Sequence, residues 1–237
     1  MKKIIVLLFC FFLIFFIYKI TYNNKIDYIS LGDGLALGQT YYNTVGYGYS
    51  DYVADFLKKE KKLKTYNKNF SQNHITVEEL INFIKNNKKE IINGKTVYID
   101  NAIAEAEIIT ISIGNYEISD INKYINYSYE TLIKTEEVLK KICELIDLIK
   151  KYNNEAKIYF IGYYSYGKDN NERIIRYTDK KLTEISKSKN FTFVKISDIF
   201  SKNIKYLPNT LSNYPSSLGY KRISEKVINK IKLDGFE

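Results

Sequence analysis

Short apolar runs rich in β-branched residues recur along this chain, and segments with helical periodicity separate them. The clear runs cover residues 26–31, 108–113, 158–161 and 191–194, and a fainter one covers 63–66. The clear runs are largely apolar on both faces, which is typical of parallel strands that helices cover on both sides. The pattern therefore predicts a three-layer α/β/α sandwich around a mainly parallel sheet.

The intervening segments predict five clear helices, at residues 49–58, 77–85, 127–151, 171–188 and 218–232. Thr76 and Glu79 form a capping box at the start of the second helix, where each satisfies a free amide of the first turn. Core packing explains the apolar stripe of the longest helix. That stripe consists of Leu132, Val138, Leu139, Ile142, Leu145, Ile146 and Ile149. Residues 87–97 are expected to form a surface excursion.

The N-terminus differs in character from the rest of the chain. Residues 4–18 are apolar without interruption, with Lys2 and Lys3 before them and Lys19 after them. No small-residue cleavage site follows, which favours an uncleaved anchor over the alternative of a cleaved signal peptide. We expect residues 1–20 to form a single-pass membrane anchor, and residues 21–237 to form a domain outside the cytoplasm.

Charge and cysteine content indicate which partners the protein can bind and whether disulfides or metals are expected. The chain has 36 basic and 27 acidic residues, and the basic ones are spread along helices as in DFLKKEKKLK. This spread favours solvated helix faces over nucleic-acid binding, and it permits a weak attraction to anionic wall polymers or lipid headgroups. Cys143 is the only cysteine beyond the apolar stretch, so no disulfide framework is expected. One histidine and scattered carboxylates predict no metal site, and no cofactor is expected.

Four segments at the turns of the predicted sheet stand in a characteristic order. GDGLALG follows the first strand, NKNFSQNHIT the fainter second and SIGNYEI the third, while LSNYPSSLGY precedes the last helix. In this order the segments resemble the blocks of the SGNH or GDSL ester hydrolases, including G-D-S-L, I-G-x-N-D and D-x-x-H-P. The resemblance covers residues 27–231. It implies a flavodoxin-like, SGNH-hydrolase-like sandwich with a site beyond the carboxyl ends of the strands.

The resemblance implies a catalytic serine, aspartate and histidine, but the matching positions hold other residues. Gly34 stands at the serine position, Leu211 at the aspartate position and Tyr214 at the histidine position. Glycine offers no nucleophile, leucine carries no charge, and a tyrosine with a pKa near roughly 10 is a poor base at neutral pH. We therefore expect the family mechanism to be absent.

The positions that would stabilise an oxyanion are also changed. The glycine of the second block falls at Gln72, and the asparagine of the third falls at Tyr116, although a one-residue slip would place Asn115 there. The predicted binding cleft has six residues: Asp33, Gly34, Gln72, Asn115, Tyr116 and Tyr214. Because aromatic faces suit sugars, further tyrosines are candidates for the lining of this cleft: Tyr41, Tyr42, Tyr47, Tyr163 and Tyr164. An envelope glycan or an acylated molecule is the expected ligand.

Two functions stay open from the sequence. The first is a catalytically inactive binding or scaffold module tethered at the cell envelope. The alternative is an active ester hydrolase in which relocated residues, namely His74, Asp33 and Glu117, form an acid pair or a dyad that activates water. In a purely structural interpretation, His74 packs beside a helix start, Asp33 bonds amides of its own turn, and Glu117 is solvated.

Overall fold

A parallel five-stranded sheet forms the centre of the computed structural model, which describes residues 25–124, 128–165, 169–200, 205–208 and 214–236. Its strands are β1 (Ile26–Gly32), β2 (Leu63–Asn67), β5 (Ile108–Ser112), β6 (Lys157–Ile161) and β7 (Thr192–Val194). They lie in the order β2-β1-β5-β6-β7, and every neighbouring pair is parallel. The predicted parallel sheet is therefore confirmed. The chain reverses its direction of travel across the sheet between β1 and β5, which is where such folds bind ligands.

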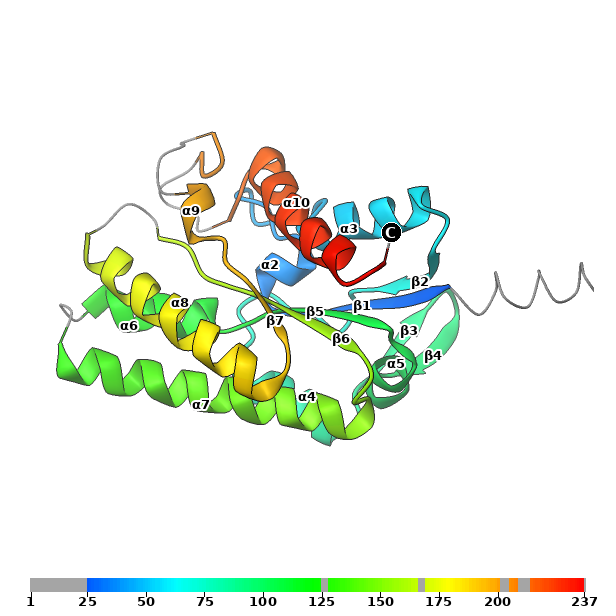
Figure 1. Cartoon of the computed structure of the whole chain (residues 1–237), viewed down its shortest axis with the longest axis horizontal. Helices are drawn as coiled ribbons and strands as arrows, with labels where there is room; N and C mark the ends of the chain where they lie inside the picture. Colours follow the sequence, from blue (N-terminus) through cyan, green and yellow to red (C-terminus); the bar gives the residue numbers. More distant parts are fainter. Residues whose placement is uncertain (1–24, 125–127, 166–168, 201–204, 209–213, 237) are drawn as a thin grey trace, which may run out of the picture.

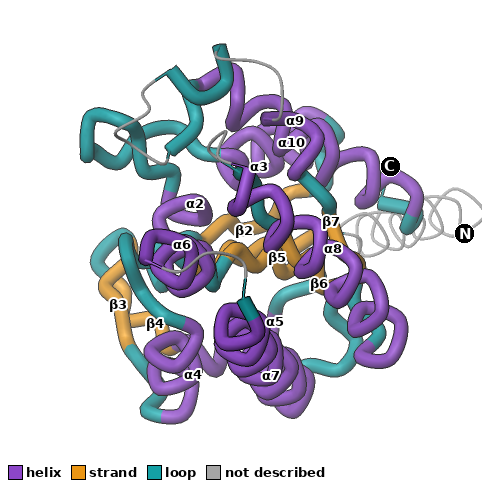
Figure 2. The backbone as a smooth tube through the Cα atoms, turned by 90° about the vertical axis from the view of Figure 1, so that its left-hand side faces the viewer, coloured by secondary structure: helices purple, strands orange, loops and turns teal. Residues whose placement is uncertain are grey.

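Helices cover both faces of this sheet (Figures 1 and 2). One face carries α3 (Tyr49–Lys59) and α10 (Ser217–Leu233), which pack against each other. The other face carries α4 (Val77–Lys85), α5 (Ile99–Glu105), α7 (Tyr129–Tyr152) and α8 (Asp169–Lys189). Three further helices begin just beyond strand ends: α2 (Gly34–Leu37), α6 (Asn115–Tyr124) and α9 (Ser197–Phe200). The predicted three-layer α/β/α architecture is confirmed.

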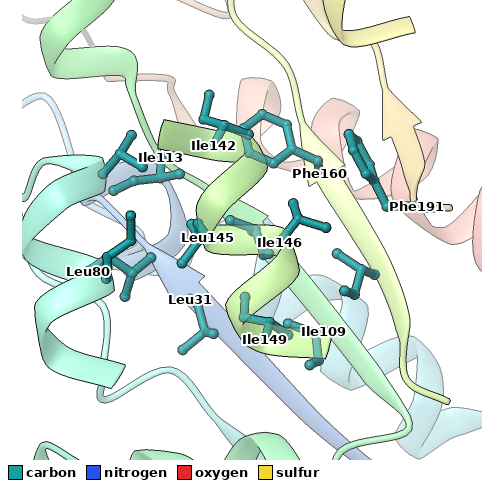
Figure 3. Close-up of a cluster of buried hydrophobic side chains, with 14 of the residues drawn as sticks. Leu31, Leu80, Ile109, Ile113, Ile142, Leu145, Ile146, Ile149, Phe160 and Phe191 are labelled. Carbon is teal, nitrogen blue, oxygen red and sulfur yellow. The ribbon is translucent and has the colours of Figure 1, made fainter. Parts of the chain in front are cut away.

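The core between the sheet and α7 is built from the predicted apolar stripe (Figure 3). Ile142, Leu145 and Ile149 are fully buried on α7, and they belong to the same cluster as Leu31 of β1 and Phe160 of β6. Both β1 and β5 are buried along their whole length, as continuous apolar runs predict. Each large aliphatic side chain buried in this way stabilises the fold by about 1.5–3 kcal/mol.

The hairpin at residues 89–98 is the main element that the sequence prediction did not resolve. β3 (Lys89–Ile92) and β4 (Lys95–Tyr98) pair antiparallel and form a second, two-stranded sheet. Asn93 and Gly94 connect them with φ values of 51° and 76°. An Asn-Gly pair with positive φ at both residues is the strongest short-range signal for a hairpin. The excursion expected at residues 87–97 is therefore an ordered hairpin.

The described chain begins at Lys25, immediately before the amino end of β1. No helix within the described residues is long and apolar enough to cross a membrane. The anchor predicted at residues 1–20 lies outside the described residues. Lys25 precedes β1 and Gly34 follows it, so the two residues lie at opposite ends of this strand. Figure 1 shows α2 at the end where β1 finishes.

Candidate functional site

The candidate site lies where β1 and β5 end, at the edge of the sheet that faces the viewer in Figure 2. Gly32 ends β1 with a φ of 132°, and a Cβ built on it would overlap the backbone carbonyl of Ser112. Only glycine permits this approach, which lets the Asp33 amide donate to the Ser112 carbonyl at 2.7 Å. The first polar side chain after β1 is thereby fixed at the point where the strand order reverses.

Asp33 caps the start of α2 and is 4% exposed. Its Oδ1 accepts hydrogen bonds from the Leu35 amide at 3.0 Å and the Ser112 hydroxyl at 3.2 Å, and its Oδ2 accepts one from the Asn115 side chain at 3.1 Å. Burial raises the pKa of Asp33 to about 6, against the opposing effect of these hydrogen bonds. The carboxylate is therefore held inward by three donors instead of projecting toward a ligand.

Gly34 is the first residue of α2, and its φ lies outside the left-handed region. A Cβ built on Gly34 would lie 2.6 Å from the Tyr214 hydroxyl oxygen and 2.5 Å from Oδ1 of Asn73. The Tyr214 hydroxyl donates a hydrogen bond to that same oxygen of Asn73. The space that a side chain at position 34 would enter is thus filled by a phenol and an amide that bond each other.

The ionisation of Tyr214 follows from its surroundings. Burial raises its pKa well above the usual range, and the nearby negative charge of Asp33 raises the pKa further. The hydroxyl consequently stays protonated at neutral pH and acts as a hydrogen-bond donor. A protonated phenol of this kind positions a partner but does not abstract a proton.

The donors expected at the oxyanion positions already have acceptors within the protein. The backbone amide of Gln72 donates to the Gly32 carbonyl at 3.0 Å. The side chain of Asn115 points to Asp33, while Tyr116 at the next position is 44% exposed. Ser71 is buried and donates to the carbonyl of Ser30 at 3.0 Å, which holds the second turn against β1.

The three residues of the alternative catalytic arrangement do not form a hydrogen-bonded group. His74 is exposed, has a φ of 60°, and its ring centre lies 5.6 Å from that of Tyr116. Oε1 of Glu117 accepts a hydrogen bond from the Val77 amide at 2.7 Å, at the first residue of α4. Its Oε2 is buried without a hydrogen-bond partner, and burial raises the pKa of Glu117. This carboxyl is therefore packed against a helix start and is not solvated.

The remaining predicted residues divide between the core, a surface loop and the part of the chain that is not described. Tyr163 and Tyr164 are 1% and 5% exposed, so they belong to the core and do not line a cleft. Tyr41, Tyr42 and Tyr47 lie in the loop between α2 and α3. Leu211 lies outside the described residues. Among the described residues no group of three or more His, Cys, Asp or Glu is placed to hold a metal ion.

Sequence reasoning missed two residues of the site. Asn73 bonds Tyr214 directly above Gly34, and Ser112 bonds Asp33 from the end of β5. Asn73 follows Gln72 in the second block, so its position next to a predicted site residue was a usable signal. Ser112 ends a buried apolar strand at the switch point of the sheet, where a polar side chain indicates a ligand-facing edge.

The chain has the three-layer fold found in SGNH-type hydrolases. No protein-family model and no curated protein matches its sequence. A lipase, Lip_vut3 from a goat rumen metagenome, is similar in structure with a TM-score of 0.71 and 14% identity, over 88% of this chain and 97% of the lipase. Axe2, an acetylxylan esterase from Geobacillus stearothermophilus, gives a TM-score of 0.63 and 17% identity, over 89% and 94%. These similarities establish the fold.

Proposed function

We propose that this protein is a catalytically inactive SGNH-hydrolase-like domain that binds a glycan or an acylated ligand at the cell envelope. The observation that supports this proposal most directly is the bonded pair of Tyr214 and Asn73 above Gly34. An ester hydrolase of this fold needs a nucleophilic side chain at that point, next to a base. Here the nucleophile is absent, and the space for one is occupied.

The donors at the oxyanion positions support the same conclusion, because they already bond acceptors within the protein. Stabilisation of a tetrahedral intermediate needs donors that are free to reach the developing oxyanion. The Gln72 amide and the Asn115 side chain each have an acceptor in the protein, at 3.0 Å and 3.1 Å. A hydrolase that has lost its triad still accelerates ester hydrolysis slightly through its oxyanion donors. Here those donors are also engaged within the protein, so this residual acceleration would be lost too.

The exposed groups of the site suggest the class of ligand. Gln72 carries an exposed amide, and the exposed rings of His74 and Tyr116 lie 5.6 Å apart, centre to centre. Amides that bond hydroxyl groups next to exposed rings suit a neutral sugar, since no free charge has to be desolvated. Axe2, which has this fold, is an acetylxylan esterase, and an acetylated glycan is therefore the first ligand to test.

The test measures binding and chemistry in the same sample. When the full-length protein is titrated with acetylated xylo-oligosaccharides, we expect a heat of binding but no release of acetate, because the site retains polar groups but no nucleophile. Fluorophosphonate probes should leave the protein unlabelled for the same reason. Tyr116→Ala should weaken binding, whereas Tyr152→Ala, which removes another exposed tyrosine at the far end of α7, is the matched control.

Robust acetate release after stringent purification would overturn the proposed inactivity. If that release disappeared with His74→Ala but not with Tyr152→Ala, the protein would be an ester hydrolase with relocated catalytic residues. Absence of both binding and release would contradict the assignment of a sugar ligand. The three outcomes are distinct in one titration series.

The proposed attachment to the membrane has its own test. Because residues 4–18 are apolar and no small-residue cleavage site follows them, we expect the N-terminus to be retained and the protein to sit in the membrane with its domain outside the cytoplasm. Intact-mass analysis of protein extracted from membranes should therefore give the uncleaved chain. A mature N-terminus beyond Lys19 would show a cleaved signal peptide instead.

A further inference from the structure

A basic surface lies at the amino edge of the sheet, opposite to the candidate site. Lys25 donates through its Nζ to the carbonyl of Lys61 at 2.8 Å, and Nζ of Lys232 lies 5.3 Å from the ring centre of Phe56 on α3. These contacts bring the start of β1, the turn after α3 and the end of α10 together, at the right-hand side of Figure 1. The amino-edge surface, as we define it, consists of Lys25, Lys58, Lys59, Lys61, Lys62, Lys230 and Lys232.

Basic residues outnumber acidic ones at this surface. The described carboxylates within or beside these segments are those of Asp27, Glu60, Glu107 and Asp234. Asp27 pairs with Lys64, Glu107 accepts a hydrogen bond from the Asp27 amide at 2.6 Å, and Asp234 accepts one from the Tyr159 hydroxyl at 2.7 Å. No ion pair between described residues involves any of the seven lysines. Lysines elsewhere are commonly paired, for example Lys64 with Asp27 at 2.6 Å and Lys68 with Asp51 at 2.7 Å.

Helix dipoles account for only part of this arrangement. The last turns of α3 and α10 contain four of the lysines, where a cation stabilises the negative end of the dipole. Lys25, Lys61 and Lys62 lie outside any helix, so the dipole gives no reason for them. Leu233, in the last turn of α10, is 79% exposed beside Lys232. An exposed leucine among lysines is the composition of a surface that meets lipid headgroups.

The course of the chain identifies the occupant of this surface. Six residues, 19–24, separate the apolar stretch at 4–18 from Lys25. Even fully extended, six residues span only about 20 Å. We propose that the amino-edge surface rests on the anionic headgroups of the membrane that holds the apolar stretch. Each lysine near such a surface strengthens binding by about fivefold, so several acting together would fix the orientation of the domain.

This orientation has a consequence for the candidate site. Seven residues of β1 separate the amino-edge surface from the turn at Gly34, a distance of roughly 23 Å along the strand. The site therefore opens away from the bilayer, toward ligands in the space outside it. The proposed docking rests on the basic surface and on the proposed membrane attachment, and it stands whether or not the site binds a sugar.

Amide hydrogen exchange of the full-length protein in nanodiscs tests the docking. The discs contain phosphatidylcholine alone or phosphatidylcholine mixed with phosphatidylglycerol. Exchange at residues 58–62 should be at least about fivefold slower in the anionic discs. That protection should disappear in about 1 M NaCl, where the Debye length is about 3 Å. Exchange at residues 114–117, at the other edge of the sheet, should be the same in both lipids.

Charge reversal separates this surface from the general basicity of the chain. The triple variant Lys58→Glu, Lys59→Glu and Lys61→Glu should abolish the lipid-dependent difference. A control with three exposed lysines elsewhere, Lys134→Glu, Lys140→Glu and Lys221→Glu, should keep it. Equal exchange in both lipids, or equal loss in both variants, would overturn the proposal. So would protection by soluble polyphosphate in neutral discs without any effect of anionic lipid, since the partner would then be a polymer.

Discussion

Replacement of Gly34 by serine is expected to destabilise the protein by about 1–3 kcal/mol, the usual cost of adding atoms to a filled space. At an unobstructed position in a helix, replacing a glycine increases the free energy of unfolding by about 0.5–1 kcal/mol. Helix propensity alone would therefore make Gly34→Ser stabilising. The new Cβ would lie 2.6 Å from the Tyr214 hydroxyl and 2.5 Å from the Asn73 side chain, and moving these groups aside costs the hydrogen bond between them. Chemical denaturation of Gly34→Ser, with Gly34→Ala beside it, measures the loss.

A double-mutant cycle assigns this loss to Tyr214. Tyr214→His removes the hydroxyl that occupies the space, so the combination with Gly34→Ser should be more stable than the two single losses predict, by about 1–2 kcal/mol. Tyr116→His is the matched control, because Tyr116 is exposed and is not among the atoms nearest to position 34. If Gly34→Ser is as stable as the wild type, or additive with Tyr214→His, then Tyr214 does not fill the nucleophile position.

The buried carboxyl of Asp33 is expected to make folding weaken as the pH rises from about 4 to about 7. Its pKa is about 6 in the folded protein and roughly 3.9 in the unfolded chain. Between these values the folded state binds more protons, so its contribution is complete below about pH 4 and is lost as the pH passes 6. Two pKa units correspond to about 3 kcal/mol of unfolding free energy.

Asp33→Asn isolates this effect, because asparagine also caps helices but carries no charge. The difference in unfolding free energy between variant and wild type should shift by about 3 kcal/mol in favour of the variant from pH 4 to pH 7. Glu184→Gln, on the exposed surface of α8, makes the same change in net charge and should give a nearly constant difference. A constant difference for Asp33→Asn as well would show that the carboxyl is not buried in its charged form.

Much of the fold was predictable because its signals are local. Period and composition located β1, β5, β6 and β7 and the long helices, and the capping box at Thr76 and Glu79 marked the start of α4. The hairpin β3-β4 had a local signal too, in Asn93 and Gly94, but its strands are short and half exposed. The helices α2, α5, α6 and α9 were not predicted. Both α2 and α9 have four residues, and elements that short owe their stability to packing and not to their own sequence.

The candidate site was likewise predictable only in its local features. The sequence established that the serine and histidine positions of the resembling family hold Gly34 and Tyr214, and that no base stands at either. It could not show that the phenol of Tyr214 enters the space above Gly34, because 180 residues separate the two positions. The role of Asn73, which bonds that phenol across 141 residues, was likewise hidden.

The sequence by itself determined the succession of strands and helices along the chain, because backbone preferences depend on each residue and its neighbours. It also determined the loss of the catalytic residue types, because that is a matter of side-chain chemistry at single positions. The tertiary structure decided which groups occupy the space above Gly34, which donors are committed, and how far Asp33 is withdrawn from water. These properties depend on segments that only the assembled sheet brings together. A pKa near 6 or a filled position above a glycine is therefore a consequence of burial and contact, which no single segment encodes.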